Sequence, residues 1–122
     1  MSDPMYGLPE DIALEFFVGL NLDQICIGAG DIILRFQRGV SLSMYCDLTF
    51  CEIGRPPAVF PCHPLTASVL TKLLNYSIVM ASRKNHGTLI LEFSNGNSLA
   101  IHDSNEGYES YVINNGDKAI VV

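Results

Sequence analysis

The strongest constraint on this chain is that it repeats itself. The segment GDIILRFQRGVSLSMY, which begins at Gly30, returns from Gly87 as GTLILEFSNGNSLAIH. Apolar residues alternate with polar ones in both copies, which is the period of half-buried antiparallel strands. Each copy also has a dipeptide ending in glycine, which favours a two-residue hairpin loop. Each copy therefore predicts a β-hairpin. The paired positions are Ile33/Ile90, Leu34/Leu91, Phe36/Phe93, Gly39/Gly96, Ser41/Ser98 and Leu42/Leu99.

The sequence upstream of each hairpin is similar in kind. LPEDIALEFFVGL, residues 8–20, has Pro9 at a first helical position, acids in the first turn and apolar residues on one face. HPLTASVLTKLLN, residues 63–75, repeats the proline, with Pro64 near its start, and the apolar face. Each predicted amphipathic helix leads into a further strand, LDQICIG in the first copy and YSIVMAS in the second. The unit is thus a helix followed by three strands, used twice.

These units set the expected domain organisation. We expect one domain over 1–122, with an internal duplication at approximately 8–51 and 64–103 and a C-terminal extension at 104–122. The proline-rich segment 51–64 is interpreted as the connection between the units. The predicted fold class is α+β: an antiparallel curved sheet or β-sandwich with two short helices. Extra C-terminal strands are expected from Tyr108 to Ile113 and from Ala119 to Val122, joined by an Asn115-Gly116 turn.

The sequence offers little for catalysis. Cys62 and His63 are neighbours whose side chains are expected to point apart, and the cysteines lack a recognisable zinc spacing. Paired carboxylates and a phosphate-binding loop are also absent from the sequence. We therefore expect no enzyme activity, no metal and no cofactor. The N-terminal segment does not resemble a secretion signal, so we expect a cytoplasmic protein with four reduced thiols and with Cys46 in the core.

The formal charge is −6, and ten of the thirteen acids lie in two runs that contain no base. The first run precedes Arg35 and the second precedes Lys118. Such a surface repels phosphate backbones, which argues against nucleic-acid binding, and it attracts a cationic partner. The alternative is that the acids only keep the protein soluble. The acids of the runs are Asp3, Glu10, Asp11, Glu15, Asp23 and Asp31 in the first, and Asp103, Glu106, Glu109 and Asp117 in the second.

The segment DSNEGYESYVI, residues 103–113, has no counterpart in the first copy. It places two tyrosines among carboxylates, and tyrosines are enriched at protein interfaces. Because Tyr108 and Tyr111 are three positions apart in an expected strand, one should lie in the core and the other should be exposed. The predicted partner-binding residues are Asp103, Glu106, Tyr108, Glu109 and Tyr111.

From Leu89 to Ile113 the chain has the pattern LxLxFxxGxxLxI, a short acidic gap and YESYVI. This pattern resembles small bacterial immunity proteins, which are encoded beside toxins delivered between competing cells, including those of contact-dependent growth inhibition systems. The resemblance covers the second half and reaches the first through the repeat. It implies a protein that is not an enzyme and that binds one cognate toxin domain, commonly a nuclease, to cover or distort its active site.

Three functions stay open at this point. The first is an immunity protein that neutralises a basic toxin domain, with either the acidic C-terminal segment or the acidic N-terminal helix as its binding surface. The second is a non-enzymatic adaptor or structural protein, dimeric through a strand edge, whose acids only solubilise it. The third is a small-molecule site or an enzyme within the curved sheet. No membrane partner is expected, because the sequence lacks an apolar run of about 20 residues.

Overall fold

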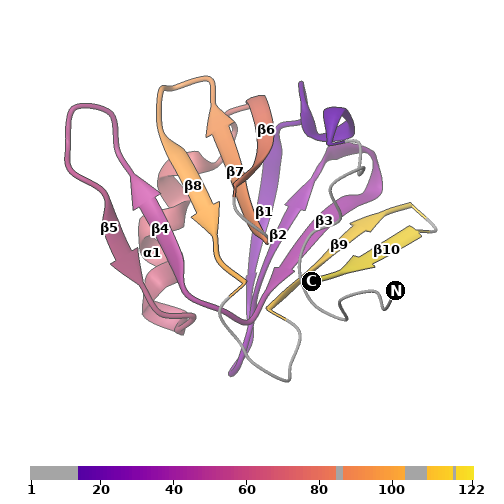
Figure 1. Cartoon of the computed structure of the whole chain (residues 1–122), viewed down its shortest axis with the longest axis horizontal. Helices are drawn as coiled ribbons and strands as arrows, with labels where there is room; N and C mark the ends of the chain where they lie inside the picture. Colours follow the sequence, from indigo (N-terminus) through magenta and orange to yellow (C-terminus); the bar gives the residue numbers. More distant parts are fainter. Residues whose placement is uncertain (1–13, 85–86, 104–109, 117) are drawn as a thin grey trace.

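The computed structural model describes residues 14–84, 87–103, 110–116 and 118–122. In these ranges the chain forms two five-stranded antiparallel sheets, with strand orders β1-β2-β3-β9-β10 and β5-β4-β8-β7-β6 (Figure 1). The strands are β1 (Leu22–Ile27), β2 (Ile32–Phe36), β3 (Val40–Met44), β4 (Leu48–Cys51), β5 (Ala58–Phe60), β6 (Ile78–Lys84), β7 (Thr88–Phe93), β8 (Ser98–Ile101), β9 (Tyr111–Asn115) and β10 (Lys118–Val121). An α+β fold with antiparallel sheets is therefore present.

The two predicted hairpins are confirmed. β2 pairs with β3, and β7 pairs with β8, both antiparallel. Alternate residues of β2 and β7 are buried, as the period-two pattern requires. Phe36 and Phe93 are only 5% and 2% exposed, and both belong to one hydrophobic cluster that includes residues from both sheets.

The hairpin turns differ from the predicted two-residue loops. Gln37–Gly39 separates β2 from β3, with Arg38 and Gly39 both at positive φ (62° and 73°). Residues 94–97 separate β7 from β8, and in this loop only Gly96 has a positive φ (89°). The Asn97 carbonyl oxygen accepts a hydrogen bond from the Phe93 N–H (2.9 Å), and its buried side-chain Oδ1 accepts one from the Ile53 N–H (2.9 Å).

Two short helices are not confirmed. Most of the first predicted helix, 8–20, lies outside the described residues, and the part inside forms a 3-10 turn at Glu15–Phe17 that ends before Gly19 (φ 91°). The second predicted helix lies where expected but is short. Its α-helical part, α1 (Ala67–Leu70), is flanked by 3-10 turns at Pro64–Thr66 and Thr71–Leu73. The His63 ring caps its start, with Nδ1 accepting a hydrogen bond from the Leu65 N–H (3.1 Å).

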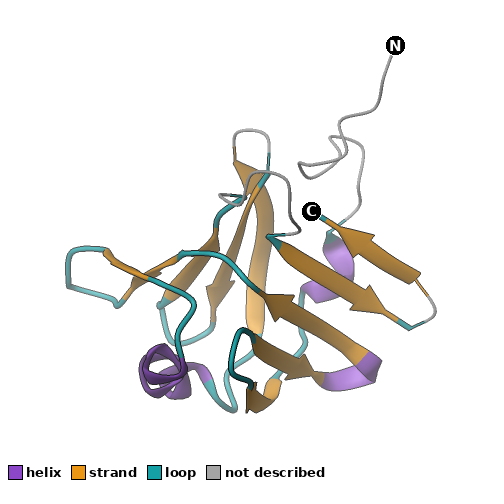
Figure 2. Cartoon of the chain, turned by 90° about the horizontal axis from the view of Figure 1, so that it is seen from below, coloured by secondary structure: helices purple, strands orange, loops and turns teal. Residues whose placement is uncertain are grey.

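The segment interpreted as a connection, 51–64, contains β5, the second strand of a hairpin that was not predicted from the sequence. β4 and β5 pair antiparallel, with Leu48 opposite Phe60 and Phe50 opposite Ala58. Prolines at 56, 57 and 61 made a strand seem improbable, yet they lie just outside β5. β5 is an edge strand, and an edge tolerates nearby proline because few of its N–H groups are needed for pairing. Figure 2 shows α1 beside this hairpin.

The C-terminal extension completes the first sheet. β9 pairs with β3, with Leu42 opposite Ile113, and β10 lies at the sheet edge. The predicted strand at 108–113 is observed from Tyr111 onward, since 104–109 lies outside the described residues. Gly116 has a positive φ (67°) in the predicted turn, and the final strand is confirmed within one residue.

Candidate functional site

The predicted site lies where the chain leaves β8 and enters β9. Asp103 follows β8, and Tyr111 is the first residue of β9. Glu106, Tyr108 and Glu109 lie in 104–109, outside the described residues. We call residues 103–110 the acidic segment. The structure describes its two ends, Asp103 and Ser110, which with their bonded neighbours form what we call its base.

Tyr111 is the core member of the tyrosine pair. Its side chain is fully buried (0% exposed), and its hydroxyl donates a hydrogen bond to the Gly87 carbonyl oxygen (2.6 Å). Burial raises the pKa of this hydroxyl above its ordinary value, with smaller contributions from the charges of Cys46 and Asp103. Tyr111 therefore takes the core position expected for one of the two tyrosines, and its ring is not exposed as an anchor; partner binding by the predicted residues stays a prediction.

Asp103 is also used within the chain. It is half-buried, and its Oδ1 accepts a hydrogen bond from the Ser110 hydroxyl (2.9 Å). Its side chain packs so closely on Gly87 that a Cβ at that glycine would lie 2.6 Å from Asp103. Asp103 and Ser110 thus join the two ends of the acidic segment. The sequence could not reveal this bond, because it depends on the close approach of β8, β9 and Gly87.

Val122 holds the second end of the acidic segment. The N–H groups of Ser110 and Tyr111 both donate to its carbonyl oxygen (2.6 and 3.3 Å), and its own N–H donates to the Tyr111 carbonyl oxygen (2.9 Å). The Val122 side chain is fully buried. The base of the acidic segment is therefore fixed by backbone and side-chain bonds together.

The charge of the chain is unevenly divided. Ten of the thirteen acids lie in two runs of the sequence that contain no base. Six of these ten lie outside the described residues: Asp3, Glu10, Asp11, Glu106, Glu109 and Asp117. Of the N-terminal run, Glu15 and Asp23 are exposed and Asp31 is half-buried.

The cysteines and histidines of the described ranges have structural partners. All four cysteines are free thiols, and Cys46 is buried (2% exposed), with its pKa raised to about 12, chiefly by burial. The Cys62 thiol donates to the Met44 carbonyl oxygen (3.2 Å), while His63 caps a helical turn, so the two do not form a nucleophile and base pair. Among the described residues, no group of three His, Cys, Asp or Glu side chains could hold a metal ion.

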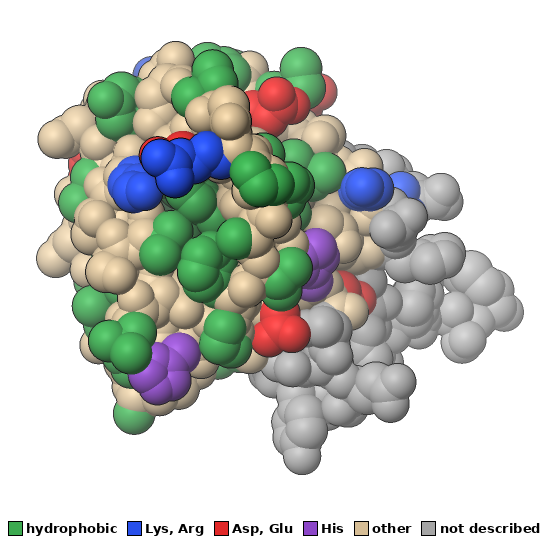
Figure 3. All heavy atoms as spheres, turned by 90° about the vertical axis from the view of Figure 1, so that its left-hand side faces the viewer, with side chains coloured by type: hydrophobic (Ala, Val, Ile, Leu, Met, Phe, Trp, Pro, Cys, Tyr) green, Lys and Arg blue, Asp and Glu red, His purple; other side chains and the backbone are tan. Residues whose placement is uncertain are grey.

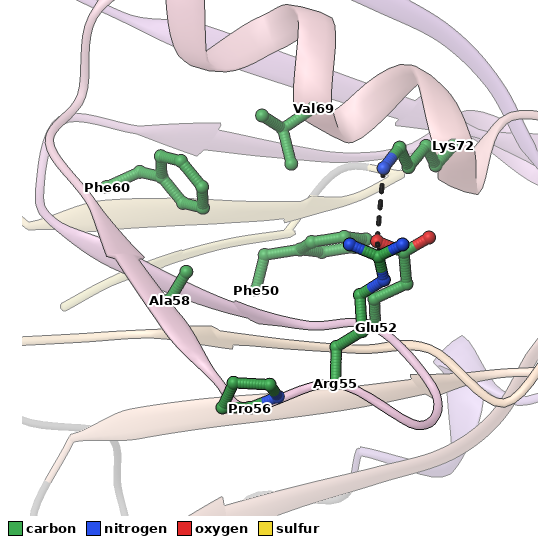
Figure 4. A pocket seen from close by; sticks show the side chains of 8 residues that line it. All are labelled: Phe50, Glu52, Arg55, Pro56, Ala58, Phe60, Val69 and Lys72. Carbon is green, nitrogen blue, oxygen red and sulfur yellow. Dashed lines mark hydrogen bonds and ion pairs between the residues drawn. The ribbon is translucent and has the colours of Figure 1, made fainter.

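A second feature, which the sequence reading missed, is a cavity of about 300 Å³ between the β4–β5 hairpin and α1 (Figure 4). Apolar side chains form most of its wall, and three charged side chains lie at one end. The two-residue spacing of Phe50 and Glu52, and of Ala58 and Phe60, places each pair on one face and is the sequence signal for this cavity. The prolines of 51–64 mask that signal. The lining residues are Phe50, Glu52, Arg55, Pro56, Ala58, Phe60, Val69 and Lys72.

The chain matches no protein-family model, no curated protein and no solved structure. Within the described ranges, the helices are all too short to cross a membrane. The function must therefore be argued from the residues themselves.

Proposed function

We propose that this chain is an immunity protein that binds and neutralises one cognate toxin domain, a basic nuclease, and acts without catalysis in the cytoplasm. The observation that carries the proposal is the division of charge. Ten of the thirteen acids lie in two runs of the sequence that contain no base, and the second run includes the acidic segment. Acids that only kept the protein soluble would be interspersed with bases rather than gathered in two runs.

The chemistry of a nuclease fits this arrangement. A nuclease cleft is cationic because it holds phosphates, so carboxylates presented at comparable places can occupy it. Opposite charge also steers the two proteins together and raises the association rate. Glu106 and Glu109 are the acids we assign to this contact, with Tyr108 as the aromatic anchor, since Asp103 and Tyr111 are engaged at the base of the segment.

The hydrogen bonds at the base of the acidic segment support a role in partner binding. Asp103, Ser110 and Val122 fix both ends of the acidic segment to the two sheets. A segment with fixed ends loses less conformational entropy on binding than one held at a single end. The acidic N-terminal segment is the rival binding surface, and the same toxin would recognise it through the same charge.

We also propose that residues 8–51 and 64–103 are duplicated units, each a helix and three strands, within one domain over 1–122. In the described ranges both halves contain a three-stranded meander, β1-β2-β3 and β6-β7-β8, each preceded by a helical turn. Both meanders also carry an irregularity in their first strand, at Leu22/Gln24 and at Ile78/Met80. Equivalent irregularities are what a duplicated unit would inherit.

A non-enzymatic adaptor that dimerises through a strand edge is the second candidate. β6 is an edge strand on which Val79 and Met80 are 54% and 51% exposed, and exposed apolar groups on an edge favour pairing with another chain. Sedimentation equilibrium of the purified chain distinguishes the adaptor from the immunity protein, because the adaptor forms a dimer in the absence of any partner.

The test of the proposed function begins with capture of the partner from the native host and its identification by mass spectrometry. We expect a basic nuclease domain whose activity is abolished when one equivalent of the chain is added, and whose expression is tolerated only by cells that also express the chain. A partner with no toxic activity, or a nuclease whose activity survives saturation with the chain, would contradict the proposal.

A further inference from the structure

The cavity between the β4–β5 hairpin and α1 has an apolar wall built from three elements. Phe50 lies on β4, Ala58 and Phe60 lie on β5, and Val69 lies on α1. Phe50 is paired with Ala58 across the hairpin, so their side chains share one face of the sheet. Figure 4 shows these side chains pointing into one space from both sides.

The charged end of the cavity carries a local excess of positive charge. The Glu52 Oε1 lies 3.1 Å from the Lys72 Nζ and 4.0 Å from the Arg55 Nε. One carboxylate therefore faces two cations, which leaves a formal charge of +1. The Arg55 and Lys72 side chains are 75% and 52% exposed, against 31% for Glu52. The cations can thus reach a ligand while they retain their internal partner.

Charge and apolar surface adjoin on this face of the molecule. Figure 3 shows a group of basic side chains beside a cluster of hydrophobic ones. In a chain of net charge −6, two of the seven bases line this one cavity. An anion is repelled by the net charge of the chain but attracted by the two cations of this cavity, and a purely apolar ligand would leave those cations without a new partner.

We propose that this cavity binds a small amphipathic carboxylate, with its apolar tail among Phe50, Phe60 and Val69 and its carboxylate at Arg55 and Lys72. The volume of about 300 Å³ lies at the small end of ligand sites, which suits a short aliphatic or single-ring tail. Burial of the tail supplies most of the affinity, because it removes apolar surface from water. The Arg55 fork selects the planar carboxylate.

The test is a titration of the ¹⁵N-labelled full chain with octanoate, followed by amide chemical shifts. We expect saturable shifts at residues of β4, β5 and α1. Acetate, which has the same head group without the tail, and octylamine, which has the same tail with the opposite charge, should produce no saturable shifts there. Scattered shifts that follow octylamine and octanoate equally would overturn the proposal, since they would indicate non-specific apolar binding.

Two variants separate the head group from the tail. Arg55→Glu should weaken octanoate binding by about tenfold or more, because it replaces a cation with an anion at the rim. Its matched control is Arg38→Glu, which makes the same charge change at an exposed turn of the other sheet and should leave the affinity unchanged. Val69→Trp fills the cavity from a half-buried position and should abolish binding while the chain stays folded by circular dichroism. Equal weakening by Arg55→Glu and Arg38→Glu, or octanoate binding that survives in folded Val69→Trp protein, would refute the site.

Discussion

Asn21 and Ser77 form an antiparallel bridge where the two sheets meet, each immediately before the first strand of its meander. The hydrogen bonds around this bridge come in matching pairs, and adding 56 to the residue numbers of one half gives those of the other. In the first pair, the Leu22 N–H donates to the Tyr76 carbonyl oxygen (3.1 Å), and the Ile78 N–H donates to the Leu20 carbonyl oxygen (3.0 Å). In the second pair, the Asn75 N–H donates to the Leu22 carbonyl oxygen (2.9 Å), and the Gly19 N–H donates to the Ile78 carbonyl oxygen (2.8 Å).

Backbone conformation follows the same relation. Gly19 and Asn75, also 56 positions apart, both have positive φ (91° and 70°), where a side chain with a Cβ is strained. A Cβ at Gly19 would meet no atom within 4 Å, so Gly19→Ala tests the backbone alone. We expect a loss of about 1 to 2 kcal/mol in the free energy of unfolding, measured with urea.

Gly30→Ala is the matched control, because a Cβ at Gly30 also meets no atom within 4 Å and its φ is not in the left-handed region. It should be neutral or slightly stabilising, since alanine lowers the entropy of the unfolded chain. Equal losses at both glycines would show that the backbone of Gly19 is not under this constraint.

The two phenylalanines of the repeat should be equally important for stability. Phe36→Ala and Phe93→Ala each remove a nearly buried ring from the core and should cost about 3 to 5 kcal/mol in urea unfolding. Val59→Ala, on a residue that is 69% exposed, is the control and should change stability by about 0.5 kcal/mol or less. A loss below about 1 kcal/mol for either phenylalanine would contradict the buried positions described above.

The hairpins and C-terminal strands could be predicted because alternation of apolar residues reports directly on burial of one sheet face. The β4–β5 hairpin could not, since prolines flank a strand of only three residues and mask its period. The second helix was foreseen from Pro64, but its length depends on packing against the sheets, which helix propensity does not encode.

The candidate site was predictable only in part. The three-residue spacing of Tyr108 and Tyr111 correctly implied that one ring is in the core, but not that it would be Tyr111, which reaches the Gly87 carbonyl from a distant strand. The bond between Asp103 and Ser110 and the cavity beside α1 both arise from contacts between segments far apart in the sequence.

The thiols should react in an order set by burial. Unfolded protein should react with four equivalents of a thiol reagent without prior reduction, because all four cysteines are free. In the folded protein Cys46 should be the slowest, since it is buried and its pKa is raised to about 12, which leaves little thiolate at neutral pH. If the slowest phase of the reaction disappears in Cys46→Ala protein, that phase belongs to Cys46. A slowest phase that persists in that variant would contradict the assignment.

Stability should fall in alkali. Burial raises the folded-state pKa of Cys46 from 9.0 to about 12. The stability that comes from keeping this thiol protonated is therefore fully present below pH 9 and is lost as the pH rises toward 12. The pKa of Tyr111 is raised in the same direction from 10.0, so its contribution is lost above pH 10. Each group should lower the free energy of unfolding by at most about 1.4 kcal/mol per pH unit.

Urea unfolding followed by circular dichroism between pH 8 and pH 11 checks this expectation. Cys46→Ala should make the profile shallower between pH 9 and 10, where Tyr111 does not yet contribute; the Cys62 thiol, whose pKa is also raised by burial, accounts for a remaining decline. A profile that declines equally in the parent protein and in Cys46→Ala across that interval would show that Cys46 is not the group responsible.

The proposed function depends on the carboxylates of the acidic segment, and reversal of their charge tests it. Glu106→Lys/Glu109→Lys changes the charge of the acidic segment by +4 and leaves its base of Asp103, Ser110 and Val122 intact. Asp23→Lys/Asp47→Lys is the matched control, since it makes the same charge change at two exposed positions within the described ranges. Circular dichroism should show that both variants are folded.

The most direct measurement is the dissociation constant of each variant for the captured toxin domain, taken at several salt concentrations. Close charge pairs across such interfaces have coupling energies of about 1.5 to 7 kcal/mol, so reversal of Glu106 and Glu109 should weaken binding by about 100-fold or more and end protection of toxin-expressing cells. The control should bind and protect like the parent protein. If the Glu106→Lys/Glu109→Lys protein keeps the parent affinity, salt dependence and protection, the acidic segment is not the binding surface. A loss found only on reversing Glu10, Asp11 and Glu15 would assign that surface to the N-terminal segment instead.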